Sequence, residues 1–179
     1  MKSFKDTPPW QSIKPPSASL PCHAGKLRKV VDELDVENAP RYAPQPTATY
    51  CNIFVTDVLQ AMGHQPGHWV DDDGGPAEDG HGWELNANRM VRWFRTHGKT
   101  YGWVECDRRV ACDSAARGHT VVVGWDSQAS GPGHIAILLP EGTIAQAGRR
   151  NFVGGTIREG FGDRKVRFFV QIHGGSHDV

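Results

Sequence analysis

The chain has 179 residues, enough for one domain with a hydrophobic core of its own. Its 20 basic and 20 acidic residues give a formal net charge of zero, so the charge offers no support for nucleic-acid binding. No apolar run approaches the roughly 20 residues of a membrane-spanning helix, and the first residues lack the apolar segment of a signal peptide. We therefore expect a protein made in the cytoplasm, without a transmembrane segment and without a nucleic-acid partner.

Residues 1–40 are expected to form a proline-rich arm and a short helix that packs on a single domain, residues 41–179. Residues 1–25 are rich in Pro and Ser and lack hydrophobic periodicity, which predicts an extended arm or disorder. From Gly25 to Asn38 a helix is predicted, because apolar side chains recur at helical spacing as Leu27, Val30, Val31 and Leu34. Prolines at positions 40, 44 and 46 then favour an extended approach to the next element.

The segment from Thr49 to Gly63 predicts a helix with Cys51 in its first turn. Apolar residues follow at helical spacing, Thr49 is a candidate N-cap, and Gly63 suits the position after the last turn. The positive end of the helix dipole favours the thiolate of a cysteine placed there. A buried structural cysteine is an equally ordinary interpretation of this segment alone.

The four cysteines, Cys22, Cys51, Cys106 and Cys112, contain no C-x-x-C pair, which argues against a zinc ribbon or a redox motif. We expect free thiols, although a disulfide between Cys106 and Cys112 remains an alternative that depends on geometry.

Residues 64–82 lack periodicity and predict a long irregular loop. Its acidic cluster, residues 71–79, lacks the ligand spacing of a calcium loop, and Pro66 and Gly67 break any helix that would align His64 with His68. We therefore expect no metal and no cofactor, and we take His68 and Trp69 as candidates for contacting substrate.

The later segments predict two further helices and a sheet. Helices are expected over Glu84 to His97 and over Asp107 to Ala116, with Asp107 as the N-cap. A short extended piece is expected over 101–104, and strands over 119–125, 134–139, 143–147 and 165–172, with a glycine-rich loop over 151–162. Helices followed by a meander of strands predict an α+β fold with an antiparallel sheet.

A cysteine nucleophile needs a base, and the base needs a residue that orients it. His134 opens a predicted strand, and Gln146 lies in the next one. If the turn falls at residues 140–142, the two side chains lie opposite each other, within reach of a hydrogen bond. The Gln146 amide oxygen would then accept from one ring nitrogen of His134 and leave the other nitrogen for Cys51.

These residues resemble a known family. The sequences Tyr50-Cys51-Asn52-Ile53-Phe54, Arg117-Gly118-His119-Thr120-Val121-Val122, Gly133-His134-Ile135-Ala136-Ile137-Leu138 and Ile144-Ala145-Gln146-Ala147 occur in that order. Together they look like the motifs of NlpC-type and CHAP-type cell-wall cysteine peptidases, over roughly residues 42–150. The resemblance implies a papain-like fold with Cys51 as nucleophile, His134 as general base and Gln146 as orienting residue. The chain departs from the family pattern at Tyr50, at Asn52-Ile53 and at His119.

The resemblance implies hydrolysis of an amide bond in peptidoglycan stem or cross-link peptides. The backbone N–H of Cys51 is a candidate oxyanion donor, with Tyr42 or Asn52 as the second. Action at the cell wall would follow release through a holin, as for an endolysin, or injection into a rival cell, where an immunity or delivery protein is the expected partner. The alternatives are a papain-like hydrolase or acyltransferase that acts on proteins or lipids, and a catalytically dead module that binds glycan or peptide.

Overall fold

The computed structural model describes residues 4–9, 11–13, 24–128 and 131–172. Its α-helices are α1 (Ala24–Leu34), α2 (Cys51–Met62), α3 (Ala87–Thr96), α4 (Arg108–Ala116) and α5 (Ile157–Phe161). Short 3-10 turns are η1 (Phe4–Asp6), η2 (Pro40–Tyr42) and η3 (Gly98–Tyr101). The strands are β1 (Trp69–Val70), β2 (Trp83–Glu84), β3 (Trp103–Cys106), β4 (Val121–Trp125), β5 (His134–Leu138), β6 (Ile144–Gln146), β7 (Phe152–Gly155) and β8 (Arg167–Gln171).

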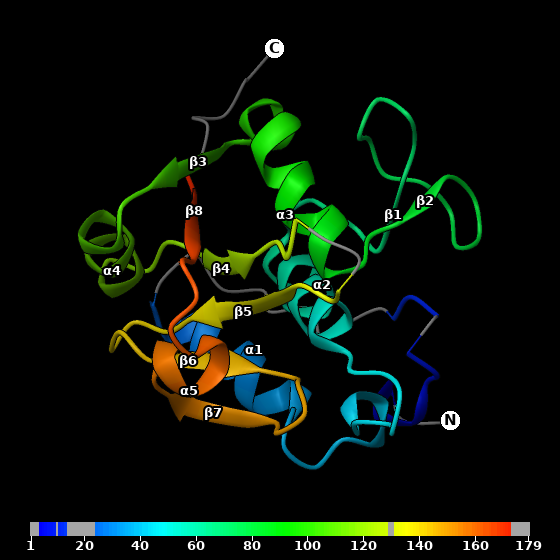
Figure 1. The fold of residues 1–179 in the computed structure, drawn as a ribbon, viewed down its shortest axis with the longest axis horizontal. Helices are drawn as coiled ribbons and strands as arrows, with labels where there is room; N and C mark the ends of the chain where they lie inside the picture. Colours follow the sequence, from blue (N-terminus) through cyan, green and yellow to red (C-terminus); the bar gives the residue numbers. More distant parts are fainter. Residues whose placement is uncertain (1–3, 10, 14–23, 129–130, 173–179) are drawn as a thin grey trace.

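A six-stranded antiparallel sheet runs through the molecule in the order β3-β8-β4-β5-β6-β7 (Figure 1). The predicted α+β class with an antiparallel sheet is confirmed at this level. The predicted meander holds only for β4 to β7, because β8, the last strand in sequence, lies between β3 and β4. A separate two-stranded ribbon pairs β1 with β2.

Helices cover both faces of the sheet, because side chains alternate between faces along each strand. One face, which includes Val122, Ile135 and Ile137, packs in a hydrophobic cluster with α1, α2 and α3. The other face, which includes Ala136 and Leu138, packs in a second cluster with residues of α4 and α5. The helix predicted over Gly25 to Asn38 is α1, which ends earlier, at Leu34, and shares the main core of the domain.

The central helix α2 is buried almost along its whole length, with Phe54, Val58 and Leu59 fully shielded from solvent. It ends as predicted at Gly63, whose φ of 79° places it in the left-handed region that glycine adopts readily. The predicted N-cap is wrong: Tyr50 occupies that position, without a side-chain cap. Cys51 is therefore the first helical residue, with the unpaired amide groups of the first turn around it.

The structure differs from the predicted elements at two further places, the start of α3 and the glycine-rich stretch 151–162. The helix α3 begins at Ala87, because Glu84 pairs in β2 and Asn86 caps the helix by accepting from the Arg89 N–H. The glycine-rich stretch predicted as a loop contains β7 and α5, and α5 begins with a capping box between Thr156 and Glu159.

The described parts of the N-terminal arm are attached to the domain by polar contacts. Arg41 donates to the carbonyls of Thr7 and Pro8, Lys5 pairs with Asp35, and Ser12 bonds Asp79. The remaining positions predicted as arm lie outside the described residues. Within the described ranges, no helix is long and apolar enough to cross a membrane.

Candidate active site

A cleft of about 860 Å³ opens where α2 begins and where β5 and β6 approach their shared end. Cys51, His134 and Gln146 all line it, so three residues from distant parts of the sequence meet at one place. Its walls also include Asn52 from α2, Asn88 from α3 and Trp125 from the end of β4.

Cys51 lines the cleft but is buried rather than exposed to solvent. The residue is 3% exposed, and the nearby backbone amides of Ile135, Asn52 and Cys51 itself lower the pKa of the thiol. Burial nevertheless raises the pKa of the thiol to about 11, and the three amides offset only part of that rise. The helix dipole still favours the thiolate, as expected from the sequence, but desolvation of the charged sulfur outweighs it.

His134 and Gln146 form the predicted hydrogen bond, with 2.7 Å between His134 Nε2 and Gln146 Oε1. The orientation of the amide is fixed by its other end, because Gln146 Nε2 donates to the Arg150 carbonyl at 3.0 Å. An amide oxygen only accepts, so we assign the ring hydrogen of His134 to Nε2. Nδ1 is then left with a lone pair, as a general base requires.

The pairing of the two strands differs from the predicted one by two residues. Ile137 lies opposite Ala145 and Leu138 opposite Ile144, a register that carries Gln146 to a place across from Ala136. The turn falls where predicted, at residues 140–142, between Leu139 and Thr143. A turn centred on residue 141 makes His134 and Gln146 diagonal neighbours rather than directly opposed ones. They share a face of the sheet, and a diagonal separation is within reach of side chains of this length.

Close packing holds the imidazole and the amide in place. The Phe161 ring of α5 lies 4.8 Å from the His134 ring, centroid to centroid. A Cβ at Gly160 would stand 2.5 Å from Gln146 Oε1, so the α5 backbone approaches the amide as closely as only glycine allows. Burial lowers the pKa of His134, as does the nearby charge of Arg164, while the bond to Gln146 raises it. At neutral pH the resting pair is thus a neutral thiol and a neutral imidazole.

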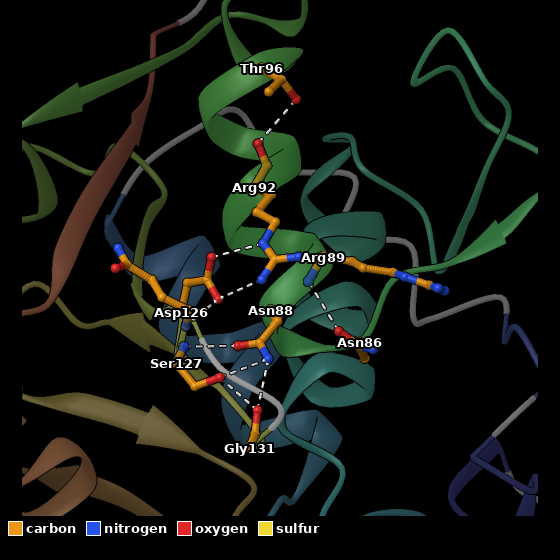
Figure 2. A network of polar contacts seen from close by, with 9 residues as sticks. Asn86, Asn88, Arg89, Arg92, Thr96, Asp126, Ser127 and Gly131 are labelled. Atoms are coloured by element: carbon orange, nitrogen blue, oxygen red, sulfur yellow. Dashed lines mark hydrogen bonds and ion pairs between the residues drawn. The ribbon is translucent and has the colours of Figure 1, made fainter.

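The loop that leads into His134 is held by α3, as Figure 2 shows. The Asn88 amide accepts from the Ser127 N–H and donates to the Ser127 hydroxyl and to the Gly131 carbonyl. One turn further along α3, Arg92 pairs with Asp126 through two nitrogens. Gly133, directly before His134, leaves no room for a Cβ, which would meet Asn88 Oδ1 at 2.2 Å. The start of β5 is therefore fixed by side chains from α3.

Between the thiol and the imidazole themselves, no hydrogen bond is present in this part of the structure. The sulfur instead lies against the backbone of Ile135, the chain neighbour of His134. Nucleophile–base contacts in ligand-free sites are often long and tighten only when substrate binds. The thiol and the imidazole both line one cleft, and a side-chain movement would bring them into hydrogen-bonding distance.

The four residues predicted to bind the oxyanion or the substrate are Tyr42, Asn52, His68 and Trp69, and they lie in different places. Asn52 lines the cleft, but its amide donates to the Leu85 carbonyl. Tyr42 is fully buried and donates its hydroxyl to Asp57, which also pairs with Arg41 through two nitrogens.

His68 bonds Glu84, and Trp69 lies in the β1–β2 ribbon. Neither they nor Tyr42 are among the residues that line the cleft.

Several cleft residues were not singled out from the sequence, namely Trp125, Arg149, Arg150, Glu159 and Arg164. Two of them, Arg149 and Arg150, follow Gln146 closely in sequence, which was the available signal. The others come from segments whose fold depends on tertiary pairing.

The remaining cysteines and acidic residues show no metal-binding arrangement within the described ranges. No group of three or more His, Cys, Asp or Glu there suits a metal ion. In the acidic loop, Asp71 accepts from the N–H groups of Asp73 and Gly75 and closes the turn itself. Cys51, Cys106 and Cys112 are free thiols. Cys22 lies outside the described residues.

Comparison with known proteins adds no family assignment: no protein-family model matches the chain, and no curated protein matches it significantly.

Proposed function

We propose that this protein is a cysteine hydrolase that cleaves an amide bond in peptidoglycan stem or cross-link peptides through a thioacyl intermediate on Cys51. The observation that carries the proposal is the meeting of Cys51, at the first turn of α2, with the hydrogen-bonded pair His134–Gln146 in one cleft. The papain-like fold, and the choice of peptidoglycan, rest on the resemblance of the motifs around these residues to cell-wall cysteine peptidases.

The chemistry begins from the neutral pair. When substrate closes the site, His134 Nδ1 takes the Cys51 proton, and the thiolate attacks the amide carbonyl. The backbone N–H groups of Cys51 and Asn52, in the unpaired first turn of α2, suit an oxyanion that forms beside the sulfur. The imidazolium then protonates the leaving amine, and water attacks the thioester with the same ring as base.

Gln146 orients the ring but carries no charge. It fixes the Nε2–H tautomer and stabilises the imidazolium less than a carboxylate would. Because burial already lowers the pKa of His134, the ring stays available as a base below its ordinary range, near 6.5. We therefore expect the acid limb of activity to lie below pH 6.5.

Digestion of purified peptidoglycan tests the proposal. Wild type should release fragments whose masses, read by mass spectrometry, identify the bond, and Cys51→Ala should release none. Cys112→Ala, which removes a thiol on α4 away from the cleft, is the matched control and should behave as wild type. Release by Cys51→Ala at the wild-type rate would refute the proposal, as would the absence of any fragments from wild type.

One observation favours a second candidate, a module that binds peptide without cleaving it. The Cys51 thiol is buried with a pKa of about 11, and it has no bond to His134 in the ligand-free site. For such a module, wall peptides would bind to the cleft and no acyl-enzyme would be trapped at Cys51 when the reaction is quenched with acid.

Action at the cell wall, in the periplasm or beyond, completes the proposal. We propose that the protein reaches the wall by release through a holin or by injection through a secretion apparatus, with an immunity or delivery protein as partner. Cells that express wild type in the cytoplasm should survive, and cells that direct the same chain to the periplasm should lyse. This pair of results would support action at the cell wall. Lysis that persists with Cys51→Ala would contradict it.

A further inference from the structure

The cleft has an excess of positive charge, although the chain as a whole has none. Arg149, Arg150 and Arg164 line it, and Glu159 is the one carboxylate among its described lining residues. A cleft with the average composition of this chain would carry no net charge. The excess of arginine beside Cys51 and His134 therefore favours the binding of an anionic ligand.

Glu159 brings a single negative charge against these three guanidinium groups. One of its oxygens already accepts from the Thr156 N–H at 2.7 Å and from the Thr156 hydroxyl at 2.9 Å, as part of the capping box of α5. Of the three arginines, Arg150 is the one whose charge acts on it. In the described part of the chain, neither Arg149 nor Arg164 has a carboxylate partner.

Arg164 is held in a fixed position beside the reacting groups. Its guanidinium lies over the Trp125 ring, 4.6 Å from the centroid, and one nitrogen donates to the Phe161 carbonyl at 2.9 Å. Phe161 also packs on the His134 ring, so the same short helix positions both groups. A guanidinium held in this way keeps further N–H donors for a ligand and loses little entropy when the ligand binds.

We propose that the cleft selects a substrate with a free carboxylate close to the cleaved amide bond, and that Arg164, assisted by Arg149, pairs with that carboxylate. The inference rests on the proposed function and names the substrate class of the same site. Planar guanidinium groups match carboxylates through two parallel hydrogen bonds, and stem peptides carry such carboxylates between their amide bonds.

Pairing would also change the surroundings of His134. The Arg164 charge, which opposes protonation of the ring in the free site, would be balanced by the bound carboxylate. The imidazolium would then form more readily when a correct substrate is present than in the empty cleft. Selection and activation would thus use the same contact.

Binding to Cys51→Ala tests the inference without relying on cleavage. The probes are two L-alanyl-γ-D-glutamyl-L-lysine peptides, one with the α-carboxylate of the D-glutamyl residue free and one with a carboxamide there. Isothermal titration at low ionic strength should show about 10-fold to 100-fold tighter binding of the carboxylate form, as expected for a charge-assisted contact. Adding Arg164→Gln should remove most of that preference.

The matched control is Arg158→Gln, which removes an arginine of the same helix that pairs with Asp163 and does not line the cleft. It should leave the preference unchanged. Equal affinity for both probes, no binding of either, or a preference that survives both Arg164→Gln and Arg149→Gln would overturn the inference. If wild type digests the wall but any of these three results is found, the proposed hydrolase function stands and the carboxylate preference is refuted. If the carboxylate probe binds preferentially but wild type digests nothing, the hydrolase function is refuted and the carboxylate preference stands.

Discussion

Replacing Gln146 with Leu removes the acceptor that fixes the His134 tautomer while nearly keeping the side-chain volume. Gln146 is 4% exposed, and both ends of its amide are bonded. The change leaves the ring N–H and the Arg150 carbonyl without their partner, and an unpaired buried polar group costs about 1–3 kcal/mol. If the lost bond is what selects the Nε2–H form, the same energy corresponds to a fall in hydrolysis of about 5-fold to 150-fold.

Two measurements on Gln146→Leu separate orientation from folding. Long-range ¹H–¹⁵N NMR of the histidine rings reports which nitrogen of His134 is protonated, and urea unfolding gives the free energy of unfolding. We expect a mixture of tautomers in Gln146→Leu and the Nε2–H form in wild type. Gln146→Glu is the matched control, because its carboxylate still accepts from Nε2 and should keep that tautomer.

The reasoning would be refuted if Gln146→Leu kept the Nε2–H form and digested peptidoglycan within twofold of the wild-type rate. A loss of stability without any change of tautomer would reduce Gln146 to a packing residue.

Three further predictions concern the groups around this site. Asp57→Ala leaves the buried Arg41 charge unpaired and should lower the free energy of unfolding by about 3–5 kcal/mol, measured by urea unfolding with tryptophan fluorescence; a loss below 1 kcal/mol would contradict a charged pair. Because burial raises the pKa of Cys51 to about 11, its alkylation by iodoacetamide should be slow at pH 7.5 and rise about tenfold per pH unit until near that value. Peptide mapping assigns the alkylation to Cys51, and a rate at Cys51 that levels off below pH 8 would indicate a resting thiolate instead. Asn88→Ala removes three bonds to the loop before His134 and should speed amide hydrogen exchange at Ser127, Gly131 and Gly133. Unchanged exchange at these amides would contradict this role of Asn88.

Local patterns in the sequence predicted much of the fold and the central pair of the site. Periodicity found α2 and β5, and the alternation of strand residues correctly placed Ala136 on the same face as His134. The hydrogen bond from His134 to Gln146 was predicted because both ends of a short hairpin are set by local sequence. The register still differed by two residues, because a turn at residues 140–142 is centred on Glu141 and places Gln146 opposite Ala136 rather than opposite His134.

Features that depend on distant pairing were not predictable in the same way. Nothing near Arg167 indicates that its strand enters the sheet between β3 and β4. Tyr42 looked free to line a cleft because its partner, Asp57, is brought to it only by folding. The dipole argument for Cys51 ignored desolvation, which is a property of the packed core. The capping box at Thr156, by contrast, was visible in the sequence and was overlooked in favour of the glycines around it.

The position of β8 also determines the order in which the molecule can be completed. Hairpins β4–β5 and β5–β6, which carry His134 and Gln146, pair neighbours in sequence and can form as soon as they leave the ribosome. The facing edges of β3 and β4 must wait for residues 167–171. The last strand in sequence therefore joins β3, at one edge of the sheet, to the strands that carry the cleft residues.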